Sequence, residues 1–198
     1  KQTAYWLNRL GVEEYAGKKL ETLSKGNQQK VQLAQTLVCN PDIIILDEPF
    51  SGLDPVNSQV LKDVIRERIQ AGKLVIFSSH QMSYVEEFCE DIVLLNHGDV
   101  VLSGNLRDIK REYGKDRLVI SLEGMDLENT LCAMKEQMEG KLQIIGQRQQ
   151  EVIVEMTAGN TRKEILQAML AKEMIPETFG NYEPSLTEIF VERAGDQA

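Results

Sequence analysis

The sequence has few of the residues from which metal sites and disulfide frameworks are built. Its 198 residues include only three cysteines and two histidines. Cys39, Cys89 and Cys132 stand far apart, and no two of them form a C-x-x-C pair. This pattern argues against a zinc site or a disulfide framework, and reduced thiols suggest the cytosol.

Long apolar runs and an excess of positive charge are also absent. No run approaches the roughly 18 to 20 residues that a membrane-spanning helix needs, and the N-terminus lacks the basic-then-apolar form of a signal peptide. Because nucleic-acid backbones are held by clustered Lys and Arg, a chain with a formal net charge of -9 is not expected to bind them. Any membrane role is expected to be peripheral.

The first part of the chain alternates helical and strand patterns. Helical spacing covers residues 3–23, with breaks at Gly11 and Gly17, and Ser24 has the position of an N-cap for the next helix. Two continuous apolar runs, 43–46 and 74–77, are typical of strands buried on both faces of a parallel sheet, and each is followed by a helical pattern. The alternation predicts βαβ crossovers in a parallel α/β layer.

The second part has a different order of elements. A hairpin around the turn 96–99 and a polar helix over 105–113 lead to a domain boundary near residue 115, which gives domains 1–115 and 116–198. Beyond it we predict strand 117–123, helix 126–138, strands 142–147 and 150–156, helix 161–173, strand 175–182 and helix 185–193. The β-α-β-β-α-β order is that of a small ferredoxin-like α+β domain, and Ser185 with Glu188 forms a capping box for the last helix.

Two places in the first part carry groups suited to phosphate chemistry. Ser24 and Gly26 stand at the head of a helix, where free N–H groups and the dipole favour an anion, although alone such a pair is most often only a cap. Asp47 and Glu48 end the first strand, so one can hold hydrated Mg²⁺ while the other deprotonates a water. His80 follows the second strand and should emerge at the same sheet edge, where ligands of open α/β sheets collect.

The order of these motifs resembles that of ATP-binding-cassette (ABC) ATPases. Residues 23–30 resemble the ABC signature, 43–49 a Walker B strand with its catalytic glutamate, and 51–54 the D-loop, while His80 resembles the switch histidine. Residues 117–192 resemble the accessory C-terminal domain of some exporter-type ATPases. The implied fold is the C-terminal part of a P-loop, ABC-type nucleotide-binding domain with parallel strands, followed by the ferredoxin-like domain.

The resemblance also implies a role for each motif. Two copies would sandwich two ATP molecules, with Asp47 holding Mg²⁺ through water, Glu48 acting as general base and His80 contacting the γ-phosphate. The residues implied to contact nucleotide from the signature and the D-loop are Ser24, Lys25, Gly26, Asn27 and Asp54.

The sequence departs from the family pattern in two respects. Lys25 stands where the signature usually has a second glycine and Asn27 where it usually has glutamine; Lys25 either adds a cation near phosphate or points to solvent. The phosphate-binding loop G-x-x-x-x-G-K-[ST] is missing, because residues 11–19 have one residue too many between their glycines and end in Lys. We therefore expect a C-terminal fragment that is inactive alone.

The implied function is ATP hydrolysis by a transporter subunit. We expect an exporter-type protein that energises a separate transmembrane permease, acts with a second ATPase copy, and lies in the cytoplasm on the inner face of the cell membrane. One alternative is a soluble ABC ATPase of DNA repair or translation, which would be expected to show heptads or a basic surface. Another is a non-enzymatic dimerisation or regulatory module built on the ferredoxin-like domain.

Overall fold

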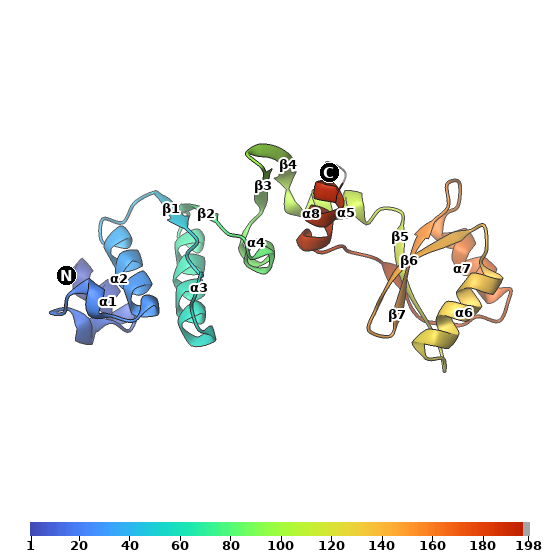
Figure 1. Ribbon diagram of the computed structural model, residues 1–198, viewed down its shortest axis with the longest axis horizontal. Coiled ribbons are helices and arrows are strands. Elements are labelled where there is room, and N and C mark those ends of the chain that lie inside the picture. Colours follow the sequence, from blue (N-terminus) through green and yellow to red (C-terminus); the bar gives the residue numbers. More distant parts are fainter. Residues whose placement is uncertain (196–198) are drawn as a thin grey trace. The chain divides into compact units, whose positions relative to one another are not determined.

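The computed structural model describes residues 1–195, and the chain divides into two compact units. The first unit comprises residues 1–88, and the second begins at Cys89. Figure 1 shows the elements of both, and each unit is described by itself below. No helix in the described part of the chain is long and apolar enough to cross a membrane.

The first unit joins a helical segment to a strand pair. Its elements are α1 Gln2–Arg9, 3-10 turns at Glu13–Tyr15 and Leu20–Thr22, α2 Lys25–Leu37, β1 Ile43–Asp47, α3 Pro55–Gln70, β2 Leu74–Ser78 and α4 Met82–Phe88. The helix predicted over residues 3–23 ends early, because Gly11 adopts a φ of 66°, which an α-helix does not allow. Only short 3-10 turns follow before α2.

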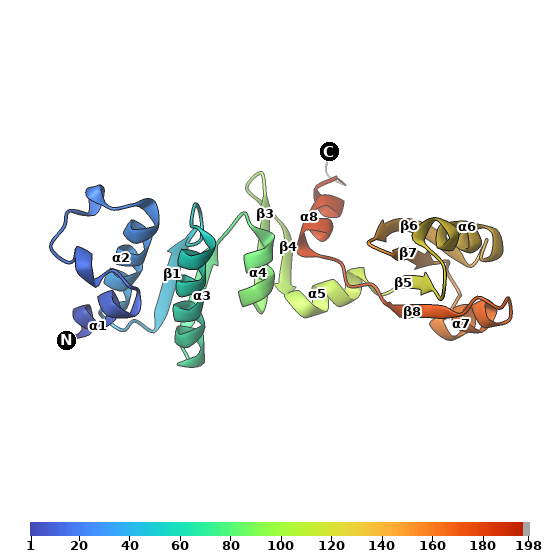
Figure 2. The ribbon, with the colours of Figure 1, turned by 90° about the horizontal axis from the view of Figure 1, so that it is seen from below.

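Strands β1 and β2 are parallel and are linked by α3, as the crossover pattern predicted. The register pairs Ile43 with Leu74 and Asp47 with Ser78, so the carboxyl ends of the two strands lie side by side. Figure 2 shows α3 running beside β1. This register places the acidic end of one strand against the serine-rich end of the other.

The prediction that these strands are buried on both faces is wrong for the described residues. Ile44 is buried, but Ile43 and Ile45 on the other face of β1 are 57% and 71% exposed. Leu74 and Ile76 of β2 are also half exposed or more. The physical reason is that, within residues 1–195, helices pack on only one face of this two-stranded sheet.

The core of the first unit fixes the turn that follows β1. It brings together apolar residues of α1, α2, β1 and α3, namely Trp6, Leu10, Leu33, Leu37, Ile44, Leu61, Val64 and Ile65. Phe50 joins this core at 2% exposure, and its ring lies 4.3 Å from Tyr84 and 5.7 Å from Phe88, centroid to centroid. The turn after β1 is therefore anchored against α4, the helix that follows β2.

The second unit begins with a hairpin and ends with a split sandwich. Its elements are β3 Asp91–Asn96, β4 Asp99–Asn105, α5 Leu106–Tyr113, β5 Arg117–Leu122, α6 Leu127–Gln137, β6 Leu142–Arg148, β7 Glu151–Met156, α7 Arg162–Leu170, β8 Pro176–Asn181 and α8 Leu186–Gly195. His97 and Gly98 both have positive φ, which is the geometry that a two-residue hairpin turn requires. The predicted hairpin is thus present.

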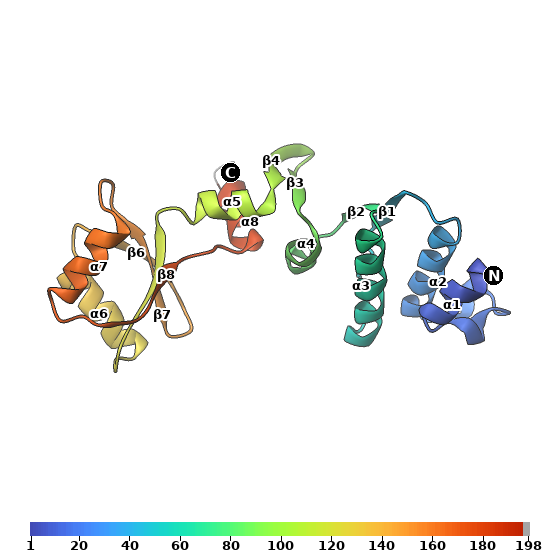
Figure 3. The same cartoon turned by 180° about the vertical axis from the view of Figure 1, so that it is seen from behind.

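The sheet of the second unit has the ferredoxin-like order. Its strands lie in the order β6-β7-β5-β8, and all three neighbouring pairs are antiparallel. Helices α6 and α7 both lie on one face of this sheet (Figure 3). The core between them consists of side chains from β5, β7 and the two helices: Leu118, Ile120, Leu122, Met134, Val152, Val154, Ile165 and Met169.

The last helix is held in place as the sequence predicted. Ser185 and Glu188 form the reciprocal capping box, with Glu188 N–H to Ser185 Oγ at 3.2 Å and Ser185 N–H to Glu188 Oε2 at 2.7 Å. A hydrogen bond from Arg193 to Tyr113 ties α8 to α5. The hairpin and α5 belong to the second unit, and the boundary predicted near residue 115 remains a prediction.

Candidate functional site

The carboxyl ends of β1 and β2 form one polar cluster. Ser78 stands opposite Asp47 in the register, and its hydroxyl donates to Asp47 Oδ1 at 2.5 Å. The hydroxyl oxygen of Ser78 also accepts the backbone N–H of Glu48 at 3.1 Å. A hydroxyl has one proton and two lone pairs, so both contacts can be made at once. The serine therefore joins the ends of the two strands.

Glu48 and His80 are held together immediately beyond the strands. Glu48 adopts a φ of 45°, the left-handed region that non-glycine residues rarely enter and that costs of the order of 1 kcal/mol or more. This conformation turns the residue out of β1. Its Oε1 accepts the His80 backbone N–H at 2.9 Å and lies 2.8 Å from the His80 Nδ1. The structure thus brings Glu48 and His80 into direct contact, with the histidine side chain 67% exposed.

This cluster offers oxygen ligands but no complete metal cage. The carboxylates of Asp47 and Glu48 are hard donors of the type that Mg²⁺ prefers. Among the described residues no group of three or more His, Cys, Asp or Glu side chains converges to hold a metal. A magnesium ion here would need water and phosphate as its remaining ligands, which is how Mg²⁺ is bound in phosphoryl-transfer sites. The donor set fits that use.

The predicted signature residues stand at the start of α2. Ser24 is the N-cap, and its hydroxyl accepts the Asn27 N–H at 3.4 Å. Gly26 is buried, and a Cβ there would lie 3.2 Å from Asn57 Nδ2 and 3.4 Å from a methyl of Leu53. The glycine therefore allows α2 to pack closely against the segment that begins α3.

The same helix end contacts the predicted D-loop. Gln29 donates from Nε2 to the carbonyl oxygen of Ser51 at 3.1 Å. The Lys25 amine lies 2.7 Å from the position that a Cβ on Gly52 would take. The sequence left two alternatives for Lys25, a cation near phosphate or a side chain in solvent. In the structure the side chain lies over residues 51–54, the predicted D-loop.

Asp54 is a helix cap. Its Oδ1 accepts the Asn57 N–H at 3.0 Å, and this makes it the N-cap of α3. Hydrogen bonds from the Asn57 backbone and then from its side chain lower the pKa of Asp54. The carboxylate therefore stays ionised, and keeps its capping role, to a lower pH than an ordinary aspartate would.

Sequence reasoning missed the residues that hold these groups in place. Ser78, Gln29 and Asn57 carry the contacts described above, and none was a predicted site residue. A signal existed for Ser78, because two apolar runs of similar length that pair in parallel bring the residues at their ends together. Gln29 lies inside the segment that resembles the ABC signature, but nothing in the sequence indicates that its side chain would bond to Ser51.

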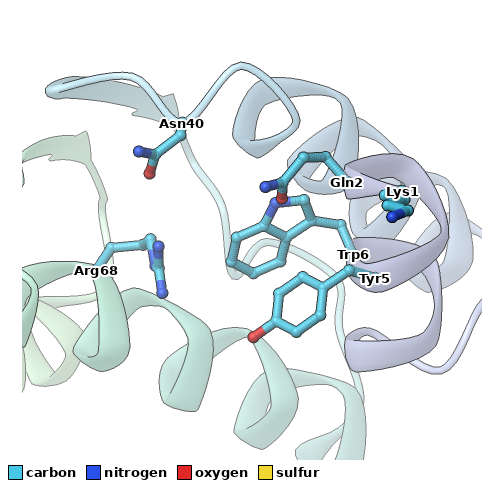
Figure 4. A pocket seen from close by; sticks show the side chains of 6 residues that line it. All are labelled: Lys1, Gln2, Tyr5, Trp6, Asn40 and Arg68. Carbon is cyan, nitrogen blue, oxygen red and sulfur yellow. The ribbon is translucent and has the colours of Figure 1, made fainter.

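A separate hollow in the first unit shares none of the predicted site residues. It is lined by Lys1, Gln2, Tyr5, Trp6, Asn40 and Arg68 (Figure 4). The Arg68 guanidinium lies 4.9 Å from the centre of the Trp6 ring, a cation–π arrangement. The indole N–H of Trp6 and Nε of Arg68 are buried without a hydrogen-bond partner. Because none of the residues lining this hollow is a predicted site residue, we do not assign it a part in the predicted chemistry.

Comparison with known proteins identifies the family. The profile of the ABC transporter family matches residues 1–51, and that of the C-terminal domain of DrrA1-3-like ATP-binding proteins matches residues 104–194. An uncharacterized ABC transporter ATP-binding protein of Alkalihalophilus pseudofirmus is 40% identical over 191 residues, which cover 96% of this chain and 68% of that protein. The chain belongs to the ABC transporter ATP-binding proteins.

Two further comparisons agree with this assignment. The ABC transporter ATP-binding protein YhaQ of Bacillus subtilis, also uncharacterized, is 38% identical over 200 residues, covering 98% of this chain and 63% of YhaQ. A solved structure described as the ATP-binding subunit of an ABC transporter superposes with a TM-score of 0.53 at 28% identity, over 68% of this chain and 53% of that one. This ABC protein thus spans about two thirds of the length of the two relatives, and both the family and the fold class predicted from the sequence are confirmed.

Proposed function

We propose that this ABC protein, in its complete form, is the ATP-hydrolysing subunit of an exporter-type ABC transporter. It would energise a separate transmembrane permease, act as a pair of identical subunits and lie peripherally on the inner face of the cell membrane. The observation that carries the proposal is the cluster at the strand ends, where Asp47 is held by Ser78 and Glu48 is held by His80. The match of residues 104–194 to the DrrA1-3-like C-terminal domain supports the accessory-domain assignment.

The cluster suits hydrolysis of a phosphoanhydride. Bound ATP with Mg²⁺ would supply the phosphoryl group and neutralise the charge that develops on its oxygens. Asp47 would accept hydrogen bonds from the metal's water ligands, and Glu48 would orient the attacking water and take its proton. His80 would hold the Glu48 carboxylate in place and extend toward the γ-phosphate. Positioning by these three residues is the main contribution a protein makes to phosphoryl transfer.

The start of α2 would serve the partner copy. Backbone N–H groups near Gly26 and the hydroxyl of Ser24 would cap the γ-phosphate bound by the other subunit, with Asn27 beside them. Lys25 would add its positive charge from over the D-loop, where Asp54 keeps the first turn of α3 in place. This proposal assigns the helix end to binding and the strand ends to chemistry.

Replacing Glu48 with Gln in the complete subunit tests the assignment of the general base. The variant should bind ATP as the wild type does and lose hydrolysis by at least about 100-fold, because an amide cannot accept the proton of the attacking water. Phosphate release and nucleotide binding are the two measurements, with the exposed Glu177→Gln in β8 as the matched control. Hydrolysis by Glu48→Gln within a few-fold of the wild type would refute the role.

The chain of residues 1–198 should be inactive by itself. It contains no G-x-x-x-x-G-K-[ST] loop, and backbone N–H groups of that loop with its lysine provide most of the affinity for ATP in such sites. We therefore expect no hydrolysis and no binding of Mg-ATP at micromolar concentrations. Titration calorimetry with a phosphate-release assay would detect either; saturable binding that Asp47→Ala abolishes would contradict the expectation.

Co-purification tests the proposed location. Isolated in gentle detergent, the complete subunit should carry a polytopic membrane protein with it. A complete subunit that stays in the soluble fraction, with no such partner, would favour a soluble ABC ATPase instead.

A further inference from the structure

The Ser78 hydroxyl occupies an unusual position between the two acidic residues of the site. It donates its proton to Asp47 Oδ1 at 2.5 Å and accepts the Glu48 N–H at 3.1 Å. One oxygen is thus bonded to the side chain of the first acid and to the backbone of the second. Ser78 ends β2, the strand beside the one that carries the two acids.

The contact with Asp47 restricts the orientation of its carboxylate. The Ser78 proton takes one acceptor site of Oδ1, so the remaining acceptor sites of the carboxylate, both of those on Oδ2 among them, face a metal-bound water in a fixed orientation. A hydrogen bond to a charged group is stronger than one between neutral groups and is enough to select one rotamer over another. Ser78 therefore holds the Asp47 carboxylate in a defined orientation at the edge of the sheet.

The contact with Glu48 fixes the backbone where the chain leaves β1. Glu48 has a φ of 45°, a conformation that persists only where surrounding bonds hold it. The hydroxyl of Ser78 binds the Glu48 N–H on one side of this turn, while the His80 N–H binds its carboxylate on the other. Ser78 and His80 lie two residues apart on the same strand end, so one segment holds both the backbone and the side chain of Glu48.

The neighbouring serine offers a natural contrast. Ser79 Oγ accepts the N–H of Gln81 at 3.1 Å and so serves the turn that leads into α4. Ser78 and Ser79 are therefore chemically identical side chains, adjacent in the chain, of which only one bonds to the acidic pair.

We infer that Ser78 is a positioning residue for ATP hydrolysis, which aligns the Asp47 carboxylate for the magnesium-bound water and holds Glu48 in its strained turn. This inference rests on the proposed function of the strand-end cluster. The site would then require a hydroxyl at residue 78. Ser78→Thr should retain the positioning role, because threonine keeps the hydroxyl and suits a strand, whereas Ser78→Ala should lose it.

The first measurement is the rate of amide hydrogen exchange at Glu48, detected by NMR on residues 1–198 without nucleotide. In Ser78→Ala the Glu48 amide should exchange at least about 10-fold faster, because the acceptor that it has among residues 1–195 is lost. Ser78→Thr should keep the wild-type rate, and so should Ser79→Ala. Far-UV circular dichroism shows whether each variant is folded; if the alanine variant is not, Ser78→Val, which has the shape of threonine without its hydroxyl, replaces it.

The second measurement is the dependence of hydrolysis on Mg²⁺ concentration in the complete subunit. Ser78→Ala should lower kcat about 10-fold and raise the Mg²⁺ concentration needed for half-maximal rate, with KM for ATP at saturating Mg²⁺ nearly unchanged. Ser78→Thr should restore both. A merely structural role would alter exchange at Glu48 without changing the Mg²⁺ dependence.

The outcomes separate this inference from the proposed function. Unchanged exchange at Glu48 in Ser78→Ala, or changed exchange with a wild-type Mg²⁺ dependence, would overturn the positioning role. Failure of threonine to restore the Mg²⁺ dependence would also overturn it. If Glu48→Gln retained hydrolysis, the proposed function would fail instead, and that result does not depend on any substitution at Ser78.

Discussion

Replacing Gly114 with alanine should strongly destabilise the second unit. Gly114 follows α5, and its N–H donates to the Lys110 carbonyl at 2.9 Å. A Cβ at this position would lie closer than 3.0 Å to the carbonyl oxygen of Tyr182 and 3.2 Å from both the Lys110 carbonyl oxygen and Pro184 Cδ. Because φ is -92°, which alanine adopts freely, the expected cost is purely steric.

The size of the effect follows from which atoms must move. Carbon-to-oxygen contacts are normally about 3.3 Å or longer, so the Tyr182 carbonyl would have to retreat by roughly 1 Å. That carbonyl belongs to the backbone between β8 and α8, and the Lys110 carbonyl belongs to α5. Neither can rotate away as the end of a long side chain can. Overpacking of this kind costs about 1–3 kcal/mol, and two backbone contacts place Gly114→Ala near 3 kcal/mol.

Urea denaturation measures this loss. Trp6 is the single tryptophan and lies in the first unit, so its emission follows that unit, while far-UV circular dichroism follows both. With a slope of about 1–3 kcal/mol per M, Gly114→Ala should move the second unit's transition down by about 1–3 M urea. Gly180→Ala is the control, since its Cβ would meet Val119 at an ordinary 3.6 Å. A midpoint for Gly114→Ala within error of that control would refute the reasoning.

Three further predictions concern other parts of the chain. Gly52→Ala should destabilise the first unit by about 1–2 kcal/mol because the φ of Gly52 is 69°. Denaturation followed by tryptophan emission should show the same cost in a Lys25→Gly background, because the flexible Lys25 amine can move away from the new methyl group. Burial and then a hydrogen bond to Glu188 raise the pKa of Tyr182 from 10.0 to about 12. The unfolded chain therefore loses this proton at lower pH than the folded one, so the stability of the second unit in urea should fall as pH rises from 10 toward 12, and Tyr182→Phe should remove that fall. Residues 115–198 should unfold cooperatively on heating, but at a lower temperature than residues 89–198, which keep the contacts of α5 with α8.

The sequence predicted the second unit more completely than the first. Its strands alternate or run apolar over short lengths between clear turns, and its helices begin at strong caps such as Thr161 and Ser185. Local chemistry of this kind is sufficient to predict the order of elements, and the antiparallel pairing follows from that order. Packing within the first unit depends instead on which surfaces meet, and that information is not local.

The exposed face of β1 and β2 illustrates this limit. An apolar run such as residues 43–46 indicates burial on both faces because that is the usual environment of a parallel strand. The rule concerns neighbours that the run itself does not specify. Among the described residues those neighbours cover Ile44 but not Ile43 or Ile45.

The candidate site shows the same division between type and geometry. Acidic residues at a strand end and a histidine after the next strand were enough to predict that Asp47, Glu48 and His80 would lie together. The left-handed turn at Glu48 was not predictable, because glutamate has no preference for positive φ. For Ser78 the similar lengths of the two apolar runs gave a signal that it would lie near Asp47. Its hydrogen bonds to both acidic residues depend on the exact register of the two strands, which the sequence does not specify.

Lys25 shows how a departure from a family motif acquires a physical meaning only through its contacts. In the sequence it was a cation beside a phosphate-binding helix end, with no way to choose between a ligand and a solvent-exposed side chain. In the structure its amine lies over Gly52, and Gln29, one helical turn along, bonds to Ser51. The start of α2 and the D-loop are thus joined by one hydrogen bond, and the Lys25 side chain lies close beside it. Substitutions at Lys25 are therefore expected to act on the D-loop as well as on any phosphate, and a glycine there would uncover Gly52 while leaving the hydrogen bond from Gln29 and the helix cap of Ser24 intact.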